Sequence, residues 1–290
     1  MRVRVGSVLK YAALSLGAVA MVAPFLDMLL GALRTPAEQW SLPIVYWPHD
    51  PQWGNFARVF NELPVWTWLF NSVVVTLAIT AIQLTTSAMA GYALAKFRFR
   101  GSRWLLSAVL GAQMFPFFLL IIPIFFMLRF APLLGGNDLL GAGGSGLLGT
   151  YAALILPFAV TWYGIFLMRQ FFMGVPDEII DAARIDGAGE FRIFAQIVLP
   201  LVRPGLATLA VFVLIYHWNE VIWTMTVTRT APELQTLPVG IYLLRGAFTD
   251  QSTQSLQQAA IFLSILPVMI VFLALQRYYV RGLTAGSVKG

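Results

Sequence analysis

The sequence contains no cysteine and is short of charge. Of its 290 residues, 11% are Asp, Glu, Lys or Arg, and 59% are hydrophobic. A soluble globular protein has about 25% charged and about 45–50% apolar residues, so this chain has too few charges to cover a water-facing surface of its size. The absence of cysteine excludes disulfides, thiolate metal sites and cysteine-based catalysis. The composition therefore predicts a membrane protein.

Other catalytic and cofactor chemistries have equally little support. His217 and Glu220 are three residues apart, which suits a shared metal, but two potential ligands do not make a site. Gly143-Gly144-Ser145-Gly146 fits the Gly-x-Ser-Gly pattern of intramembrane serine proteases, yet it falls in a glycine-rich connector and not in a membrane helix. No Gly-x-x-x-x-Gly-Lys-[Ser/Thr] phosphate-binding loop is present, so any energy from ATP has to come from another polypeptide. We expect no enzyme activity, no metal and no cofactor in this chain.

Long apolar runs are what the sequence has in abundance. A membrane-crossing helix needs about 20 mostly apolar residues. Six stretches qualify, at about residues 9–33, 67–95, 104–129, 147–172, 201–225 and 258–279. The first is too long for the apolar part of a secretory signal, about 7–15 residues, and is interpreted as an uncleaved helix. The fold class predicted is an all-α, polytopic membrane protein with six transmembrane helices in a single domain, residues 1–290.

The basic residues predict the orientation of these helices. With both termini in the cytoplasm, fourteen of the nineteen Lys and Arg residues lie inside, and five lie outside: Arg34, Arg58, Arg129, Arg229 and Arg245. Cytoplasmic connectors carry such an excess of positive charge, and tryptophans like those clustered at residues 40–68 favour the membrane interface. The net charge of +6 is dispersed between apolar blocks, which indicates anchoring to a membrane and not binding of nucleic acid.

One cytoplasmic stretch, residues 176–200, is unusually polar for this chain. Pro176, Asp177, Glu178 and Asp181 suit the first turns of a helix, where acidic side chains complement the positive end of the helix dipole. Gly187 and Gly189 are expected to end that helix. A second amphipathic segment follows, with apolar residues at Phe191, Phe194, Ile197 and Val198, and Pro200 is expected to break it. A linker helix lying on lipid headgroups is the simpler alternative, but such helices are usually basic on their polar side.

This stretch resembles the E-A-A loop of binding-protein-dependent ABC importer permeases. The loop runs Glu-Ala-Ala, three residues, Gly, nine residues, Ile-x-Leu-Pro, and the chain has Asp181-Ala182-Ala183, Gly187, Ile197 and Leu199-Pro200 at the same spacing, with Asp181 replacing the usual Glu. Residues 175–178, 183–188 and 217–220 are similar to carbohydrate-importer permeases. The tail, residues 276–290, is similar to the second permease subunit of maltose-type importers.

The resemblance implies an architecture and a set of partners. The fold would be that of the type I, MetI-like permeases of the bacterial inner membrane, with both termini cytoplasmic. The loop would be a coupling helix that docks on one of two ATPase subunits, which hold ATP and magnesium. A paralogous permease would complete a heterodimer, and an extracytoplasmic solute-binding protein would deliver a sugar. The implied coupling residues are Glu178, Asp181, Ala182, Ala183, Arg184, Asp186, Gly187, Ile197 and Pro200.

Polar residues in the fifth predicted span suggest where a solute could pass. Asn219, Glu220 and Trp223 either line the translocation pathway or form a buried network between helices that touches no solute. An ion-coupled secondary carrier is the alternative function, but carriers usually show internal repeats and several intramembrane carboxylates. Disaccharides, oligosaccharides, polyols and glycerol-3-phosphate remain open as solutes.

Overall fold

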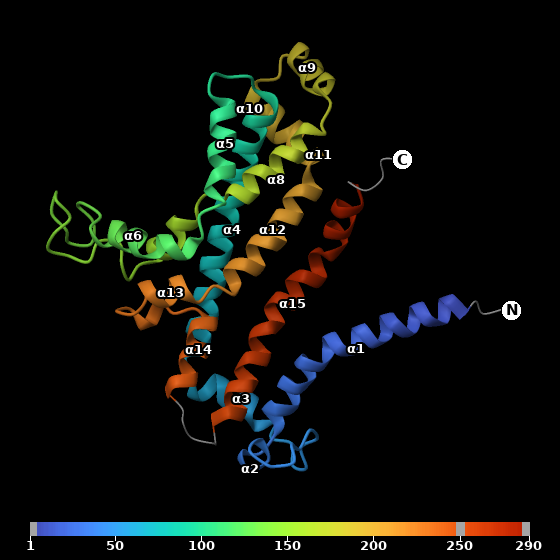
Figure 1. Ribbon diagram of the computed structural model, residues 1–290. Helices are drawn as coiled ribbons and strands as arrows, with labels where there is room; N and C mark the ends of the chain where they lie inside the picture. Colours follow the sequence, from blue (N-terminus) through green and yellow to red (C-terminus); the bar gives the residue numbers. More distant parts are fainter. Residues whose placement is uncertain (1–4, 248–252, 286–290) are drawn as a thin grey trace. The chain divides into compact units, whose positions relative to one another are not determined.

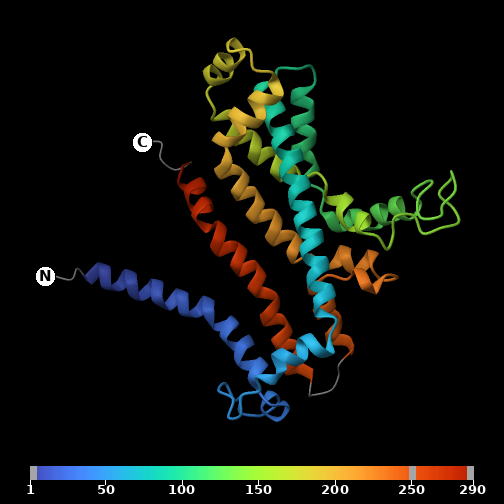
Figure 2. The same cartoon turned by 180° about the vertical axis from the view of Figure 1, so that it is seen from behind.

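The computed structural model describes residues 5–247 and 253–285, and Figures 1 and 2 show it from two sides. Every regular element in these two ranges is a helix. The α-helices are α1 (Val5–Leu33), α2 (Pro36–Gln39), α3 (Gly54–Glu62), α4 (Val65–Lys96), α5 (Ser102–Ala112), α6 (Phe117–Arg129), α7 (Tyr151–Ile155), α8 (Trp162–Met173), α9 (Asp177–Ile185), α10 (Glu190–Arg192), α11 (Leu199–Leu201), α12 (Arg203–Trp218), α13 (Ile222–Val227), α14 (Leu237–Ala247) and α15 (Gln254–Ala285). Two 3₁₀ segments, η1 (Leu156–Phe158) and η3 (Pro232–Leu234), and one π-helix, η2 (Ile193–Val198), complete the described elements.

Within the described residues, three helices are long and apolar enough to cross a membrane by themselves. These segments are Gly6–Leu33 in α1, all of α4, and Gln254–Ala274 in α15, with 28, 32 and 21 residues. At a rise of about 1.5 Å per residue, each reaches about 30 Å, the thickness of the hydrocarbon core. They correspond to the predicted spans 9–33, 67–95 and 258–279, and the prediction of an all-α membrane protein is confirmed.

The other candidate spans are pairs of helices with a bend between them. The bend is 103° between α5 and α6, 47° between Tyr151–Phe158 and α8, and 79° between Glu190–Leu201 and α12. Counting each pair as one span gives up to six spans in the described residues. The predicted continuous helices at 104–129 and 147–172 are therefore wrong in detail. Pro116 directly precedes α6, and a proline disfavours helical backbone in the residue before it, which explains the first break.

The fifth span also differs from the prediction of one helix over residues 201–225. The helical segment begins at Glu190, bends at Val202, and continues as α12 only to Trp218. Asn219–Val221 then leave the helix before the short α13 begins at Ile222. The polar pair Asn219-Glu220 therefore lies where the helix is interrupted.

The backbone divides into two compact units, Met1–Trp66 with Gly240–Pro267, and Thr67–Val239 with Val268–Gly290. In the second unit α8 packs against both α4 and α12 (Figure 2). Small residues let these helices approach closely, as is common in membranes. A Cβ at Gly91 would lie 2.8 Å from the Met168 Cβ, and one at Gly205 would lie 2.6 Å from the Phe171 ring. The single permease domain over residues 1–290 stays a prediction.

In the first unit, side chains tie the connector after α1 to neighbouring helices. The Asn55 amide of α3 donates to the carbonyl of Ala32 at 2.8 Å, and the Ser255 hydroxyl of α15 donates to that of Arg34 at 2.9 Å. Phe56 also meets Phe262 edge to face, with ring centroids 6.2 Å apart. The connector is therefore packed against neighbouring helices and is not a loose loop.

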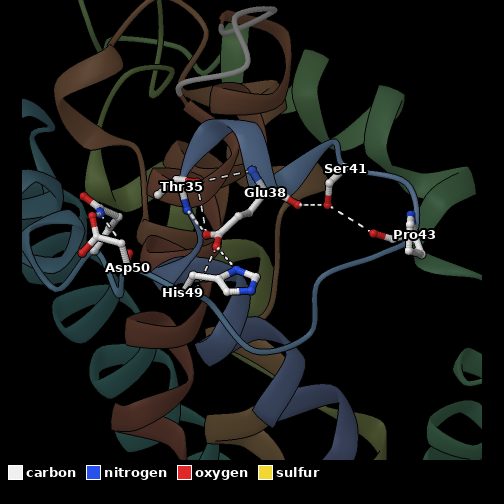
Figure 3. A network of polar contacts seen from close by, with 7 residues as sticks. Thr35, Glu38, Ser41, Pro43, His49 and Asp50 are labelled. Atoms are coloured by element: carbon white, nitrogen blue, oxygen red, sulfur yellow. Dashed lines mark hydrogen bonds and ion pairs between the residues drawn. The ribbon is translucent and has the colours of Figure 1, made fainter.

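Glu38 organises the middle of this connector (Figure 3). One carboxylate oxygen accepts hydrogen bonds from the backbone and hydroxyl of Thr35 at 2.9 and 3.1 Å, and the other contacts the backbone N and the ring Nδ1 of His49 at 2.8 and 2.9 Å. The backbone donors, that of His49 above all, lower the pKa of Glu38 from 4.5 to about 2. The Glu38 carboxylate thus connects α2 to His49, which is 11 positions further along the chain.

Candidate coupling loop and translocation site

The coupling candidate begins with α9 and a sharp turn. α9 starts after Pro176, with Asp177 and Glu178 in its first turn. At the other end, Gly187 has a φ of +80°, a left-handed conformation that favours glycine. The N–H of Gly187 donates to Arg184 and that of Ala188 to Ala183, both at 3.0 Å, which is the Schellman pattern of helix ends. The predicted role of Gly187 in ending the helix is confirmed.

An ionic cluster spans this turn. Arg184 donates from Nε and Nη2 to the two carboxylate oxygens of Glu190 at 2.7 and 3.3 Å, and from Nη1 to Asp181 at 3.1 Å. The hydrogen bonds to Glu190 raise the pKa of Arg184 above its ordinary value. All three side chains are substantially exposed, so each pair adds little stability alone. The cluster connects the end of α9 to the start of α10 and thereby fixes the direction of the turn.

The loop presents apolar side chains to solvent. Ile185 and Phe191 are 86% and 76% exposed, one on each side of the Gly187 turn. Ile185 was missed by sequence analysis, although it lies two residues beyond buried Ala183 and so on the opposite side of α9. Phe191 was counted with the apolar residues of the second amphipathic segment, but unlike Phe194, Ile197 and Val198 its side chain is exposed. These two side chains leave apolar surface on both sides of the turn, which either a protein partner or the lipid headgroups could cover.

The predicted coupling residues divide between this surface and the core beneath it. The exposed ones are Glu178, Asp181, Ala182, Arg184, Asp186 and Gly187. Ala183 is 6% exposed and packs under the turn, while Ile197 and Pro200 are half-buried in the segment that leads to α12. This segment includes the π-helix η2, whose i to i+5 hydrogen-bond pattern suits the five-residue spacing of its buried residues, Ile193 and Val198. The α-helical spacing predicted there is wrong for that reason.

The residues predicted to line a pathway lie in three different environments. Asn219 is exposed, and its amide donates to the Ile215 carbonyl at 2.7 Å. Glu220 accepts from the backbone N–H groups of Trp223 and Thr224 at 2.6 and 2.9 Å, and from the Thr224 hydroxyl at 2.7 Å. Its carboxylate therefore caps α13, as carboxylates do at helix starts. Trp223 is fully buried, and its indole N–H donates to the Ala153 carbonyl at 3.0 Å.

A buried row of polar side chains on α4 faces these broken spans, a feature that sequence analysis missed. Its members are three to four residues apart and share one helix face: Ser72, Thr76, Thr80, Gln83 and Ser87. The Gln83 amide lies 2.6 Å from the Phe158 carbonyl and 3.1 Å from Nε2 of His217, and the Thr86 hydroxyl donates to Ala159 at 3.0 Å. Phe158 and Ala159 lie at the break before α8, where backbone carbonyls of the fourth candidate span lose their helical hydrogen bonds. Side chains of α4 donate hydrogen bonds to these carbonyls instead. The periodicity of apolar residues does not reveal these polar side chains, because α4 is hydrophobic on most of its surface.

The family of the chain is shown by comparison with known proteins. Residues 83–285 match the family described as the binding-protein-dependent transport system inner membrane component. The chain belongs to this family. This result confirms the resemblance drawn from the Asp181–Pro200 pattern, and it places the permease among importers that work with a binding protein. An ion-coupled secondary carrier is not supported.

Named relatives cover almost the whole permease. The arabinooligosaccharides transport system permease protein of Halalkalibacterium halodurans is 34% identical over 93% of this chain and 91% of the relative. The sulfoquinovosyl glycerol transport system permease protein of Agrobacterium fabrum is 32% identical, with 98% and 95% covered. The sn-glycerol-3-phosphate transport system permease protein of Yersinia enterocolitica is 31% identical, with 93% of each covered.

A solved structure supports the same architecture. It is a chain of a bacterial ABC transporter involved in the import of the acidic polysaccharide alginate, with a TM-score of 0.80 and 26% identity. The similarity covers 95% of the permease and 97% of that chain. The predicted ABC importer permease fold is therefore confirmed. The tail that resembles sugar permeases, residues 276–290, lies outside the part of the chain whose side chains are described.

Proposed function

We propose that this permease is one membrane subunit of an ATP-driven sugar importer. It would pair with a paralogous permease as a heterodimer, stand on two cytoplasmic ATPase subunits that hold ATP and magnesium, and receive its solute from an extracytoplasmic binding protein. Both termini would be cytoplasmic. The observation that carries the proposal is the α9 turn, in which Ile185 and Phe191 are exposed around a conformation fixed by Gly187 and Arg184.

The ATPase subunit would cover this surface. Burying Ile185 and Phe191 would contribute about 1.5–3 kcal/mol per side chain if both were fully covered. Glu178, Asp181, Ala182, Asp186 and Gly187 would surround these apolar contacts, whereas Ala183, Ile197 and Pro200 would support the surface and connect it to α12. The outward-facing charges would select the partner more than they would strengthen its binding.

The proposed solute is a carbohydrate or a derivative rich in hydroxyl groups. The named relatives act on arabinooligosaccharides, sulfoquinovosyl glycerol and sn-glycerol-3-phosphate, which share such groups. Asn219 is the proposed contact along the pathway, because its exposed amide has both a donor and an acceptor. Glu220 and Trp223 would position Asn219 by holding the backbone on the C-terminal side of the break.

The decisive experiment measures ATP hydrolysis by the co-purified complex in lipid. Candidate solutes are added with the binding protein, and the proposal expects one class of hydroxyl-rich solute to stimulate hydrolysis and to be imported. An Ile185→Asp permease should lose the ATPase subunits on purification, whereas Leu140→Asp, at an equally exposed site in the 131–149 connector, should retain them. Uptake that follows an ion gradient and proceeds without ATP hydrolysis would contradict the proposal.

A further inference from the structure

The end of α4 is fastened directly to the start of the coupling helix. Lys96, the last residue of α4, donates hydrogen bonds from its ammonium group to the backbone carbonyl of Val175 and to the carboxylate of Asp177. Val175 is two residues before α9, and Asp177 is the first residue of α9. The two elements are about 80 positions apart in the sequence, so this contact is independent of the chain connection between them.

In this contact the Lys96 side chain is buried and the Asp177 side chain is not. The side chain of Lys96 is 7% exposed, whereas that of Asp177 is 76% exposed. The contact with Lys96 lowers the pKa of Asp177. An ammonium group removed from water needs hydrogen-bond partners, and losing them is costly, so separating Lys96 from the Val175 carbonyl is unfavourable. Asp177 adds a charged contact that water partly screens.

The remainder of α4 continues this connection into the membrane. Gly91 lies so close to α8 that a Cβ there would be 2.8 Å from both the Met168 Cβ and the Arg169 N. Further along the helix, Gln83 contacts the Phe158 carbonyl and the ring of His217. His217 lies two residues before the break at Asn219. A displacement of Lys96 would therefore be carried along a packed helix to the polar break in the fifth span.

We propose that Lys96 is a positioning residue that forms a second mechanical connection between the coupling helix and the membrane helices. The first is the covalent path from α9 through η2 and Pro200 to α12. The second runs from Asp177 and Val175 through Lys96 along α4 to Gln83 and the fifth-span break. With both connections intact, a movement of α9 would be passed to α4 as well as to α12. This inference rests on the proposed docking of an ATPase subunit on α9.

The test compares the amount of solute imported per ATP hydrolysed in reconstituted complexes. Lys96→Met keeps an unbranched side chain that is one heavy atom shorter, and it removes the ammonium donors. It should retain the ATPase subunits and their hydrolysis but import at least about fivefold less solute per ATP, the lower end of typical coupling effects. Lys96→Arg should recover part of the loss because it keeps the charge. Asp177→Asn should lose less than Lys96→Met because the Val175 contact remains.

Arg100→Met is the matched control, since Arg100 is an exposed basic residue in the adjoining connector and has no ion pair among the described residues. It should import as much solute per ATP as the wild type. An unchanged ratio in Lys96→Met, with the subunits retained, would overturn the second connection and leave the proposed function standing. If Lys96→Met does not assemble, an unchanged ratio in Asp177→Asn overturns it instead. Failure of the wild-type permease to bind ATPase subunits would overturn the proposed function and this inference with it.

Discussion

Glu220 and Asn219 are adjacent residues in the fifth-span break with different surroundings. Glu220 accepts three hydrogen bonds at the start of α13, whereas the Asn219 side chain is exposed and bonds only to its own helix among the described contacts. The difference separates a structural role from a solute-binding role at two neighbouring positions. Substitution of each residue should therefore affect a different measured quantity.

Glu220→Ala should destabilise the break by about 0.5–2 kcal/mol, the usual effect of losing a helix cap. The measured consequences are a lower thermal midpoint of the purified complex and a lower maximal uptake rate. Asn219→Ala loses only one exposed hydrogen bond, so it should lower the midpoint less than Glu220→Ala does, and it should raise the KM for uptake because it removes a proposed solute contact. An unchanged midpoint in Glu220→Ala would argue against the capping role, and an unchanged KM in Asn219→Ala would remove Asn219 from the pathway.

Glu38 gives a prediction about pH. Its pKa is lowered from 4.5 to about 2, so its ionised form stabilises the folded connector. This stabilisation of the folded connector is therefore present above about pH 4.5 and is lost as the pH falls towards 2. Glu38→Gln lacks it at every pH. Pepsin should cleave residues 35–50 faster in Glu38→Gln than in the wild type at pH 4.5, and the two rates should converge by pH 2. A ratio of rates that does not change with pH would contradict this role of Glu38.

At the scale of elements, the turn after α9 offers two glycines for comparison. Gly187 has a φ of +80° and Gly189 has a φ of −70°, and a Cβ would meet no atom within 4 Å at either position. Any difference between alanine substitutions therefore reports backbone conformation and not crowding. Comparing alanine variants at these two positions therefore tests the backbone conformation of the turn and not the chemistry of its surface.

Gly187→Ala should cost about 1–2 kcal/mol, because a side chain disfavours left-handed backbone. That cost corresponds to about a 5- to 30-fold lower population of the docking conformation. Import coupled to ATP hydrolysis should fall accordingly, whereas Gly189→Ala should behave like the wild type. The comparison uses transport assays on complexes with equal amounts of ATPase subunit. Equal transport by both variants would show that the turn conformation does not matter for coupling.

The sequence predicted that the candidate spans are helical and roughly where they lie, but not the breaks within them. Apolar runs suffice for the first because about 20 such residues cross a bilayer whether or not the helix is continuous. The break before α6 had a visible signal in Pro116, and the break at Asn219-Glu220 had one that was interpreted only as a possible solute contact. The pairing of Gln83 with His217, 134 positions away, has no local signal. The π-helix was missed because its period differs from the 3.6 residues assumed in pattern reading.

At the scale of the whole molecule, orientation is the property that the charge distribution predicts and that labelling can test. The natural chain has no cysteine, so a single introduced cysteine reports its own site. Leu140 and Ile185 are 89% and 86% exposed, which makes both accessible to reagent. A membrane-impermeant thiol reagent should label Leu140→Cys in intact cells, and Ile185→Cys only after the membrane is opened. The reverse pattern would invert the predicted topology.

The polar row on α4 has a consequence for biogenesis. The second span is synthesised before the fourth, so the Gln83 amide enters the bilayer before the carbonyl of Phe158 exists. A polar side chain in hydrocarbon is unfavourable until it finds a partner. The growing chain therefore carries an unmet hydrogen-bonding demand, which the arrival of the fourth span satisfies. The hydrogen bond from Gln83 to Phe158 therefore favours correct pairing of these two helices during membrane insertion.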